Sequence, residues 1–183
     1  LKALLITSAV SQDGKSSIAV NLGLSLAQTR RNVIIVDANL RWPKIHKLLG
    51  VSNENGLSNL LNQDIFPEDL NPFIQQTKYD RLFVLPSGSP TPNPAELLGI
   101  KSMEELIEEL KNIFDWVIVD SPSCLSVTDA IVLAPVVDGV LLVVRKGWVR
   151  KEVLMNTYRQ LSIANANLIG FVINRTEVGS GSR

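Results

Sequence analysis

One stretch near the start of the chain decides its fold: Ala9-Val10-Ser11-Gln12-Asp13-Gly14-Lys15-Ser16. An apolar run, residues 3–6, precedes it, and a stretch typical of a helix, residues 18–28, follows it. A phosphate-binding loop (P-loop) requires this context, because its backbone N–H groups and the positive end of the helix dipole face the same anion. The alternative is a glycine turn that caps a helix carrying Lys15 by chance. A small residue, four free positions and Gly-Lys-Ser rarely coincide in this context, so we favour the P-loop.

The residues of this loop have distinct predicted roles toward a nucleoside phosphate. Lys15 is expected to reach the β- and γ-phosphates, Ser16 to ligate Mg²⁺ through its hydroxyl, and Ser17 to contact the α-phosphate. The remaining predicted contacts to the nucleotide come from Gln12, Asp13 and Gly14.

Composition limits the class of protein. The 183 residues fit one domain, for which we predict residues 1–176, followed by a flexible tail, residues 177–183, of linker composition. Lys and Arg balance Asp and Glu at 18 each, so no strongly basic face is expected and no nucleic-acid partner is predicted. A single cysteine, Cys124, excludes an intrachain disulfide, and a single histidine, His46, excludes a histidine-based metal cluster. We expect both side chains to have packing roles.

The ends of the sequence suggest a piece of a longer protein. The chain starts with Leu1, directly on a predicted strand, and closes on Gly-Ser-Gly-Ser-Arg. No apolar run approaches the roughly 18 residues that a membrane span needs, and there is no pattern of a signal peptide.

Short apolar runs alternate with helical patterns along the chain. Six runs are apolar at almost every position, which is typical of strands buried on both faces of a parallel sheet: 3–7, 33–37, 82–85, 116–120, 139–145 and 168–174. Helices are predicted over 18–28, briefly after Pro43, and over 102–114, 127–133 and 149–164. A proline-rich stretch, residues 86–94, is expected to be a rigid loop. The alternation predicts an α/β fold, a doubly wound and mostly parallel sheet with helices on both faces.

Two acidic residues end apolar strands. Asp37 closes the run 33–37, and Asp120 closes the run 116–120. Ligands of doubly wound sheets bind at the carboxyl ends of the strands, so both carboxylates are expected to meet the P-loop. In P-loop enzymes such a carboxylate holds Mg²⁺, usually through water.

The sequence around these carboxylates resembles the bacterial tyrosine kinases that govern export of capsule and exopolysaccharide. Asp37-Ala38-Asn39-Leu40-Arg41-Trp42-Pro43 resembles their second acidic motif (Walker A′), and Asp120-Ser121-Pro122 resembles their Walker B motif. The resemblance continues in order over nearly the whole chain, through residues 56–61, 85–88, 93–98, 126–130, 137–140, 143–145 and 174–175.

This resemblance implies a P-loop NTPase fold and an ATP-dependent, non-specific protein-tyrosine kinase that autophosphorylates. Lys15 and Mg²⁺ would neutralise the phosphates of ATP, with Ser16, Asp37 and Asp120 around the metal. Asp37 would take the proton of the acceptor hydroxyl. Arg41 would contact phosphate or a neighbouring subunit.

The resemblance also implies a cellular setting. Asn174 and Arg175 occupy the region in which relatives contact adenine. The partners implied are ATP and ADP, a membrane activator or chain-length determinant protein, and further copies of the chain in a ring. The expected place of action is the cytoplasmic face of the inner membrane.

Several positions depart from the kinase pattern. The loop reads Ser11-Gln12-Asp13 where Pro-Gly-Glu is usual, and the lost glycine restricts φ at Gln12. Asn39 replaces the second aspartate of the Walker A′ motif, which removes a charge. The usual cluster of tyrosines at the end of the chain is expected to be either truncated or missing: the sequence holds Tyr79, expected at the surface, and Tyr158, expected in the core.

Two alternatives to an active kinase stay open, the first of them because of these departures. One is a catalytically weak ATP-binding module that regulates the same export system. The other is a ParA/MinD-like ATPase, against which Val10 argues because those proteins carry a signature lysine at that position.

Overall fold

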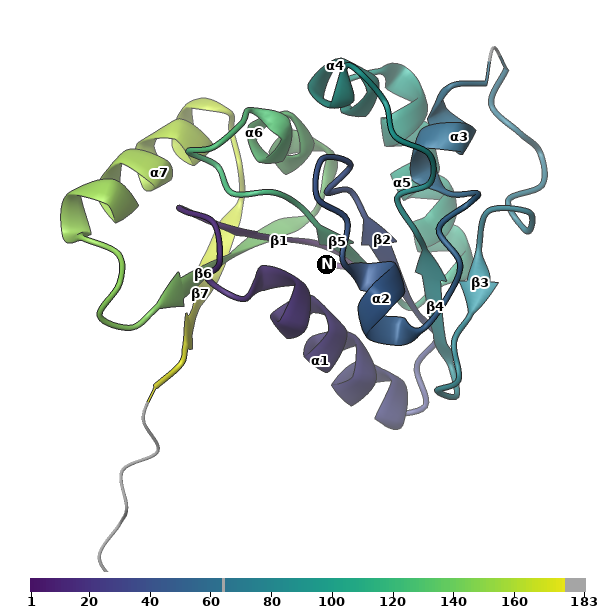
Figure 1. Ribbon diagram of the computed structural model, residues 1–183, viewed down its shortest axis with the longest axis horizontal. Helices are drawn as coiled ribbons and strands as arrows, with labels where there is room; N and C mark the ends of the chain where they lie inside the picture. The colour runs from purple at the N-terminus through teal and green to yellow at the C-terminus, as the bar shows by residue number, and fades with distance from the viewer. Residues whose placement is uncertain (64, 177–183) are drawn as a thin grey trace, which may run out of the picture.

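The computed structural model describes residues 1–63 and 65–176, so the predicted tail, residues 177–183, lies outside the described residues. Its centre is a twisted sheet with the strand order β3-β4-β2-β5-β1-β6-β7 (Figure 1). The strands are β1 (Ala3–Ser8), β2 (Val33–Asp37), β3 (Gln75–Gln76), β4 (Leu82–Leu85), β5 (Trp116–Asp120), β6 (Gly139–Arg145) and β7 (Leu168–Asn174). All neighbouring pairs are parallel except the edge pair β3–β4.

The predicted doubly wound sheet is confirmed. All six predicted strands form, and β1 extends one residue further than expected, to Ser8. Every residue of β1, β2 and the end of β5 is buried, which is why these strands read as continuous apolar runs. The short strand β3 was not predicted, because two glutamines at a sheet edge carry no apolar pattern.

Helices cover both faces of the sheet (Figure 1). On one face lie α1 (Lys15–Gln28) and α2 (Ile45–Leu49), whose apolar side chains pack with those of Ile6, Ile35 and Ile118. The other face carries α3 (Leu57–Leu61), α4 (Pro94–Leu98), α5 (Lys101–Ile113), α6 (Asp129–Leu133), a 3₁₀ turn (Ala134–Val136) and α7 (Lys151–Ile163).

The helix predictions hold except for two short helices. The sequence patterns missed α3 and α4, since five-residue helices show too little periodicity to be recognised. The proline-rich loop is confirmed as far as Asn93, and Pro94 is the first residue of α4, where its missing N–H costs no helical hydrogen bond.

The amphipathic helix α5 shows how the outer layer is fixed. Met103, Leu106, Ile107 and Leu110 are buried against the sheet, while the glutamates of the opposite face are exposed, as predicted. The prediction for Tyr158 was wrong: its side chain is 47% exposed, because α7 buries only its Thr157 and Leu161 edge. Tyr79 is exposed and Cys124 is buried, as predicted.

The winding of the sheet brings three chain segments together. Strands β2, β5 and β1 are neighbours, so the P-loop after β1 lies beside Asp37 and Asp120 at the ends of the other two. This is the switch point at which doubly wound sheets bind ligands. Within the described part of the chain, none of the helices combines the length and the apolar character needed to cross a membrane.

Candidate active site

The P-loop connects β1 to α1 and is shaped by two residues with positive φ. Gln12 has φ +67° and Gly14 has φ +91°, so both lie in the left-handed region that favours glycine. A Cβ at Gly14 would also collide with the side-chain amide of Asn174. That amide donates a hydrogen bond of 2.8 Å to the carbonyl of Asp13, which ties the end of β7 to the loop.

The side chain of Lys15 is drawn inward along the loop. Its Nζ donates to Ser8 Oγ at 3.0 Å, and the Ser8 hydroxyl donates in turn to the carbonyl of Val10 at 2.5 Å. Burial lowers the pKa of Lys15, and the charges of Asp120 and Asp13 oppose this effect. The ammonium is therefore held close to its own loop, where an arriving phosphate can replace its weak hydroxyl partner.

Ser16 and Asp120 form the pair of oxygen donors expected of a hard cation. The Ser16 hydroxyl donates to Asp120 Oδ2 at 2.6 Å, and Asp120 is fully buried. Its second oxygen, Oδ1, is buried without a hydrogen-bond partner. A buried carboxylate oxygen left unpaired is costly, and a divalent cation bound by a serine hydroxyl and this carboxylate satisfies it. The oxygen atoms of Ser16 and Asp120 are therefore suitable ligands for Mg²⁺.

Asp37 organises the chain that follows β2. Its Oδ2 accepts the backbone N–H groups of Lys44, at 3.2 Å, and Ile45, at 3.0 Å, and its Oδ1 accepts that of Asn39 at 3.3 Å. Burial and the neighbouring charge of Asp120 raise the pKa of Asp37, and burial also raises that of Asp120. Asp37 thus fixes the loop between β2 and α2 while its proton affinity is increased.

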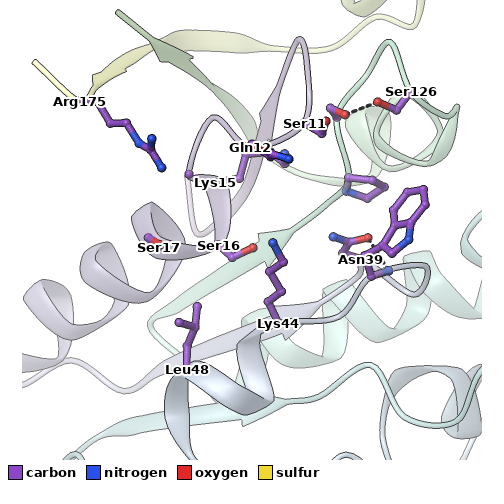
Figure 2. Close-up of a pocket in the computed structure, with 14 residues that line it drawn as sticks. Ser11, Gln12, Lys15, Ser16, Ser17, Asn39, Lys44, Leu48, Ser126 and Arg175 are labelled. Atoms are coloured by element: carbon purple, nitrogen blue, oxygen red, sulfur yellow. Dashed lines mark hydrogen bonds between the residues drawn. The ribbon is translucent and has the colours of Figure 1, made fainter.

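A cavity of about 740 Å³ opens above the P-loop (Figure 2). Its size suits a nucleotide. Six of the residues predicted to bind the nucleotide line it: Gln12, Gly14, Lys15, Ser16, Ser17 and Arg175. The predicted residues Asp13, Asp37, Asp120 and Asn174 do not line it, because they lie beneath its wall or behind the loop.

The side chain of Asp13 does not face the cavity. Its side chain is fully buried, and neither carboxylate oxygen has a hydrogen-bond partner. Burial raises its pKa, against the opposing charge of Lys15. Any contact between Asp13 and a nucleotide therefore runs through its backbone.

Arg41 lies outside the cavity and pairs with an acid that sequence reasoning gave no role. Its Nε and Nη2 donate to the two oxygens of Asp129, each at 3.0 Å. Asp129 is fully buried at the start of α6, and this pairing raises the pKa of Arg41. The ion pair fastens the Walker A′ segment to the segment after Walker B, so in this structure the guanidinium is occupied by the protein itself.

Seven further residues that sequence reasoning did not assign to the nucleotide site line the cavity. They are Ser11, Trp42, Lys44, Leu48, Pro122, Ser123 and Ser126. Ser11 belongs to the P-loop itself, and the only signal of the others in the sequence is that they lie in the segments that follow Asp37 and Asp120. Asn39 also lines the cavity, and its side-chain oxygen accepts the N–H of Trp42 at 3.2 Å.

Known proteins with similar sequences and folds include tyrosine kinases. A family model described as an AAA domain matches residues 10–168. Tyrosine-protein kinase YwqD of Bacillus subtilis is 36% identical over 182 residues, which cover 100% of this chain and 76% of YwqD. The solved kinase domain of Escherichia coli tyrosine kinase ETK has a TM-score of 0.88 at 34% identity, over 100% of this chain and 72% of that one.

A more distant ATPase shares the fold. The cell division ATPase MinD of Pyrococcus furiosus has a TM-score of 0.79 at 25% identity, over 96% of this chain and 74% of MinD. Both measures are lower than for the kinase domain, to which the whole length of this chain is similar. The chain belongs to the AAA-domain P-loop proteins and, within them, to the family of bacterial tyrosine-protein kinases.

Proposed function

We propose that this chain, through residues 1–176, transfers the γ-phosphoryl group of ATP to tyrosine hydroxyls. It would act as an Mg²⁺-dependent autokinase that regulates synthesis and export of capsule or exopolysaccharide. The observation that carries this proposal is the meeting of Asp37 and Asp120, buried side by side, with the hydroxyl of Ser16 at the P-loop.

The proposed mechanism assigns a separate task to each residue. The N–H groups of the P-loop and the ammonium of Lys15 bind the phosphates, and Lys15 exchanges its bond to Ser8 for a phosphate oxygen. Ser16 and Asp120 hold Mg²⁺, which when bound neutralises phosphate charge. Arg175, at the rim of the cavity, contacts the nucleotide base, and Asn174 positions the loop through Asp13.

Asp37 is the proposed general base. Its pKa is raised by burial and by Asp120, which makes its carboxylate a better proton acceptor than an exposed one. Its three backbone donors fix it below Asn39 and Lys44, which line the cavity that the acceptor must enter. Arg41 supports this arrangement as a positioning residue, through Asp129.

A catalytically weak ATP-binding module is the second candidate function. It is favoured by Asn39, which has no charge where the resemblance to the Walker A′ motif leads one to expect a second carboxylate, and by the left-handed φ of Gln12. In that case the nucleotide would control assembly without phosphate transfer. In either case, the proposed partners are a membrane activator and further copies of the chain in a ring at the cytoplasmic face of the membrane, a setting supported by family membership.

The experiment incubates the full-length protein with γ-labelled ATP and Mg²⁺ and detects phosphotyrosine. Lys15→Ala should abolish both the signal and binding of a fluorescent ATP analogue, whereas the exposed control Lys101→Ala should leave both unchanged. Mass spectrometry would locate the phosphate, with Tyr79 and Tyr158 both exposed enough to accept it in trans. ATP binding without any phosphotyrosine that depends on Lys15 would reject the kinase and support the regulatory module.

A further inference from the structure

A second hollow adjoins the nucleotide cavity. Its volume is about 710 Å³, and Trp42, Lys44 and Leu48 line both spaces. Figure 2 shows the side chain of Lys44 extending from the start of α2 toward Ser16, with Leu48 beside it. The two spaces therefore share three lining side chains.

The walls of the hollow combine exposed apolar surface with positive charge. Trp42 is 60% exposed and Leu48 is 48% exposed, although each is large and apolar. Lys44 and Lys47 contribute two ammonium groups, and neither forms an ion pair with any described residue. Within the described residues, no acidic side chain lines the hollow. Since the chain as a whole has no net charge, this concentration of positive charge is local.

The charges that do lie close are already neutralised. Arg41 also lines the hollow, but its guanidinium is paired with Asp129, which is fully buried. Asn53 closes another side, with its amide donating to the carbonyl of Gly88 at 3.0 Å. His46 lines the hollow as well, but burial and the charge of Lys47 lower its pKa and favour the neutral imidazole. This leaves Lys44 and Lys47 as the charged groups that attract an anion.

The hollow is fixed relative to the proposed general base. The backbone N–H of Lys44 donates to Asp37, and the N–H of Trp42 donates to Asn39. A segment that lies in the hollow is thereby held at a set distance from Asp37 and from the mouth of the P-loop. Phosphate transfer requires this type of positioning of the acceptor.

We propose that this hollow binds the tyrosine-bearing acceptor segment and selects segments with Asp or Glu close to the tyrosine. Trp42 and Leu48 pack against the apolar part of the segment, and Lys44 and Lys47 pair with its carboxylates. The proposal rests on the proposed kinase function and names its substrate class. A concave space that continues into the nucleotide cavity favours a peptide over a membrane surface.

The first test measures phosphorylation of three peptides of equal length by the full-length protein. Each has one tyrosine, flanked by glutamates, glutamines or lysines. The glutamate peptide should exceed the lysine peptide in kcat/KM by about threefold to tenfold, mainly through KM, and high salt should reduce the difference. Lys47→Glu should remove or reverse this order. The control Lys101→Glu makes the same charge change on α5 and should preserve it.

The second test measures binding without turnover. The same peptides, with phenylalanine in place of tyrosine and a fluorescent label, are titrated onto the protein saturated with ADP. The order of affinities should again follow glutamate over lysine and depend on Lys47. If no peptide is phosphorylated but this order of binding holds, the kinase function fails, and the hollow stands only as a binding site for acidic peptide segments.

Three results would overturn the acceptor site. One is equal binding and equal turnover of the three peptides. Another is a change in the order of the peptides that is no larger in Lys47→Glu than in Lys101→Glu. The third is Lys47-dependent binding to vesicles of phosphatidylglycerol with no peptide preference, which would assign the basic hollow to a lipid surface.

Discussion

Asp37 and Asp120 are register partners on the adjacent parallel strands β2 and β5, and both side chains are fully buried. Two carboxylates in such a position disfavour each other's ionised form, and burial disfavours it further. Placing the two carboxylates together destabilises the nucleotide-free protein. It also suits Asp120 to bind a cation and Asp37 to accept a proton. The site therefore carries a cost in stability that bound ligands relieve.

Asp37→Asn should stabilise the nucleotide-free protein at pH 8 by about 1 kcal/mol while it abolishes phosphotyrosine formation. Because the pKa values of Asp37 and Asp120 are raised, the native pair binds protons more tightly than the same two residues in the unfolded chain. The protonated pair therefore contributes its full stabilisation below about pH 4, and this stabilisation is lost as the pH rises through the raised pKa values. Urea unfolding at several pH values measures this. The slope of the free energy of unfolding against pH should be smaller in Asp37→Asn than in the parent protein. It should be unchanged in the exposed control Asp80→Asn.

Gln12→Gly should leave stability unchanged or raise it by up to about 1 kcal/mol, because glycine accepts the positive φ of this position without strain. It should also strengthen ATP binding by easing closure of the loop on phosphate. The matched control is Gln28→Gly at the end of α1, which should destabilise by about 1 kcal/mol. Equal destabilisation by the two changes would contradict the assignment of strain to the P-loop.

Asn39→Asp should increase phosphate transfer at saturating Mg²⁺, since it adds a carboxylate to the wall of the cavity beside Asp37. Without Mg²⁺ it should lower stability by about 1–3 kcal/mol, because Asn39 is only 8% exposed and two acids are already close. Activity assays and unfolding curves with and without Mg²⁺ measure the two effects. Asn112→Asp, exposed on α5, should change neither.

Arg41→Ala should destabilise the protein by about 3 kcal/mol, because it leaves Asp129 buried without its partner. Arg41→Lys should recover part of this loss, since it restores the charge but not the two parallel hydrogen bonds. A double-mutant cycle with Asp129→Asn, followed by urea unfolding, gives the coupling between the two residues. If Arg41→Ala removed kinase activity at unchanged stability, direct contact with phosphate or a neighbouring subunit would be the better account.

Asp138→Asn should remove a stabilising contribution that the parent protein loses as the pH falls. The Asp138 carboxylate accepts the backbone N–H groups of Lys2 and Ala3 and the ammonium of Lys111, and these bonds outweigh burial and lower its pKa to about 2. Its contribution, about 1–2 kcal/mol, is present above pH 4 and is lost as the pH falls toward 2. Unfolding curves of the variant should be flatter in this window, whereas Asp80→Asn should follow the parent protein.

Much of the fold follows from local sequence patterns. Strands such as β1 and β2 were predicted because strands buried on both faces are apolar throughout, and the P-loop because a phosphate loop is built from consecutive residues. The edge strand β7 is also apolar, but its Ile169, Phe171 and Ile173 are exposed. Asp37 and Asp120 could be placed at the ligand edge because parallel strands end on the same side. Short elements such as β3 and α3 were missed, since they are stabilised by their neighbours and not by their own periodicity.

The sequence by itself determined the doubly wound fold, the nucleotide loop and the kinase family. The tertiary structure decided that Arg41 pairs with Asp129, 88 residues away, that Asn174 supports the P-loop from 161 residues away, and that Lys44 enters the cavity. It also decided that Tyr158 is exposed. The physical reason is that a strand or a phosphate loop is encoded by adjacent residues, whereas the partner of a buried charge depends on how distant helices pack.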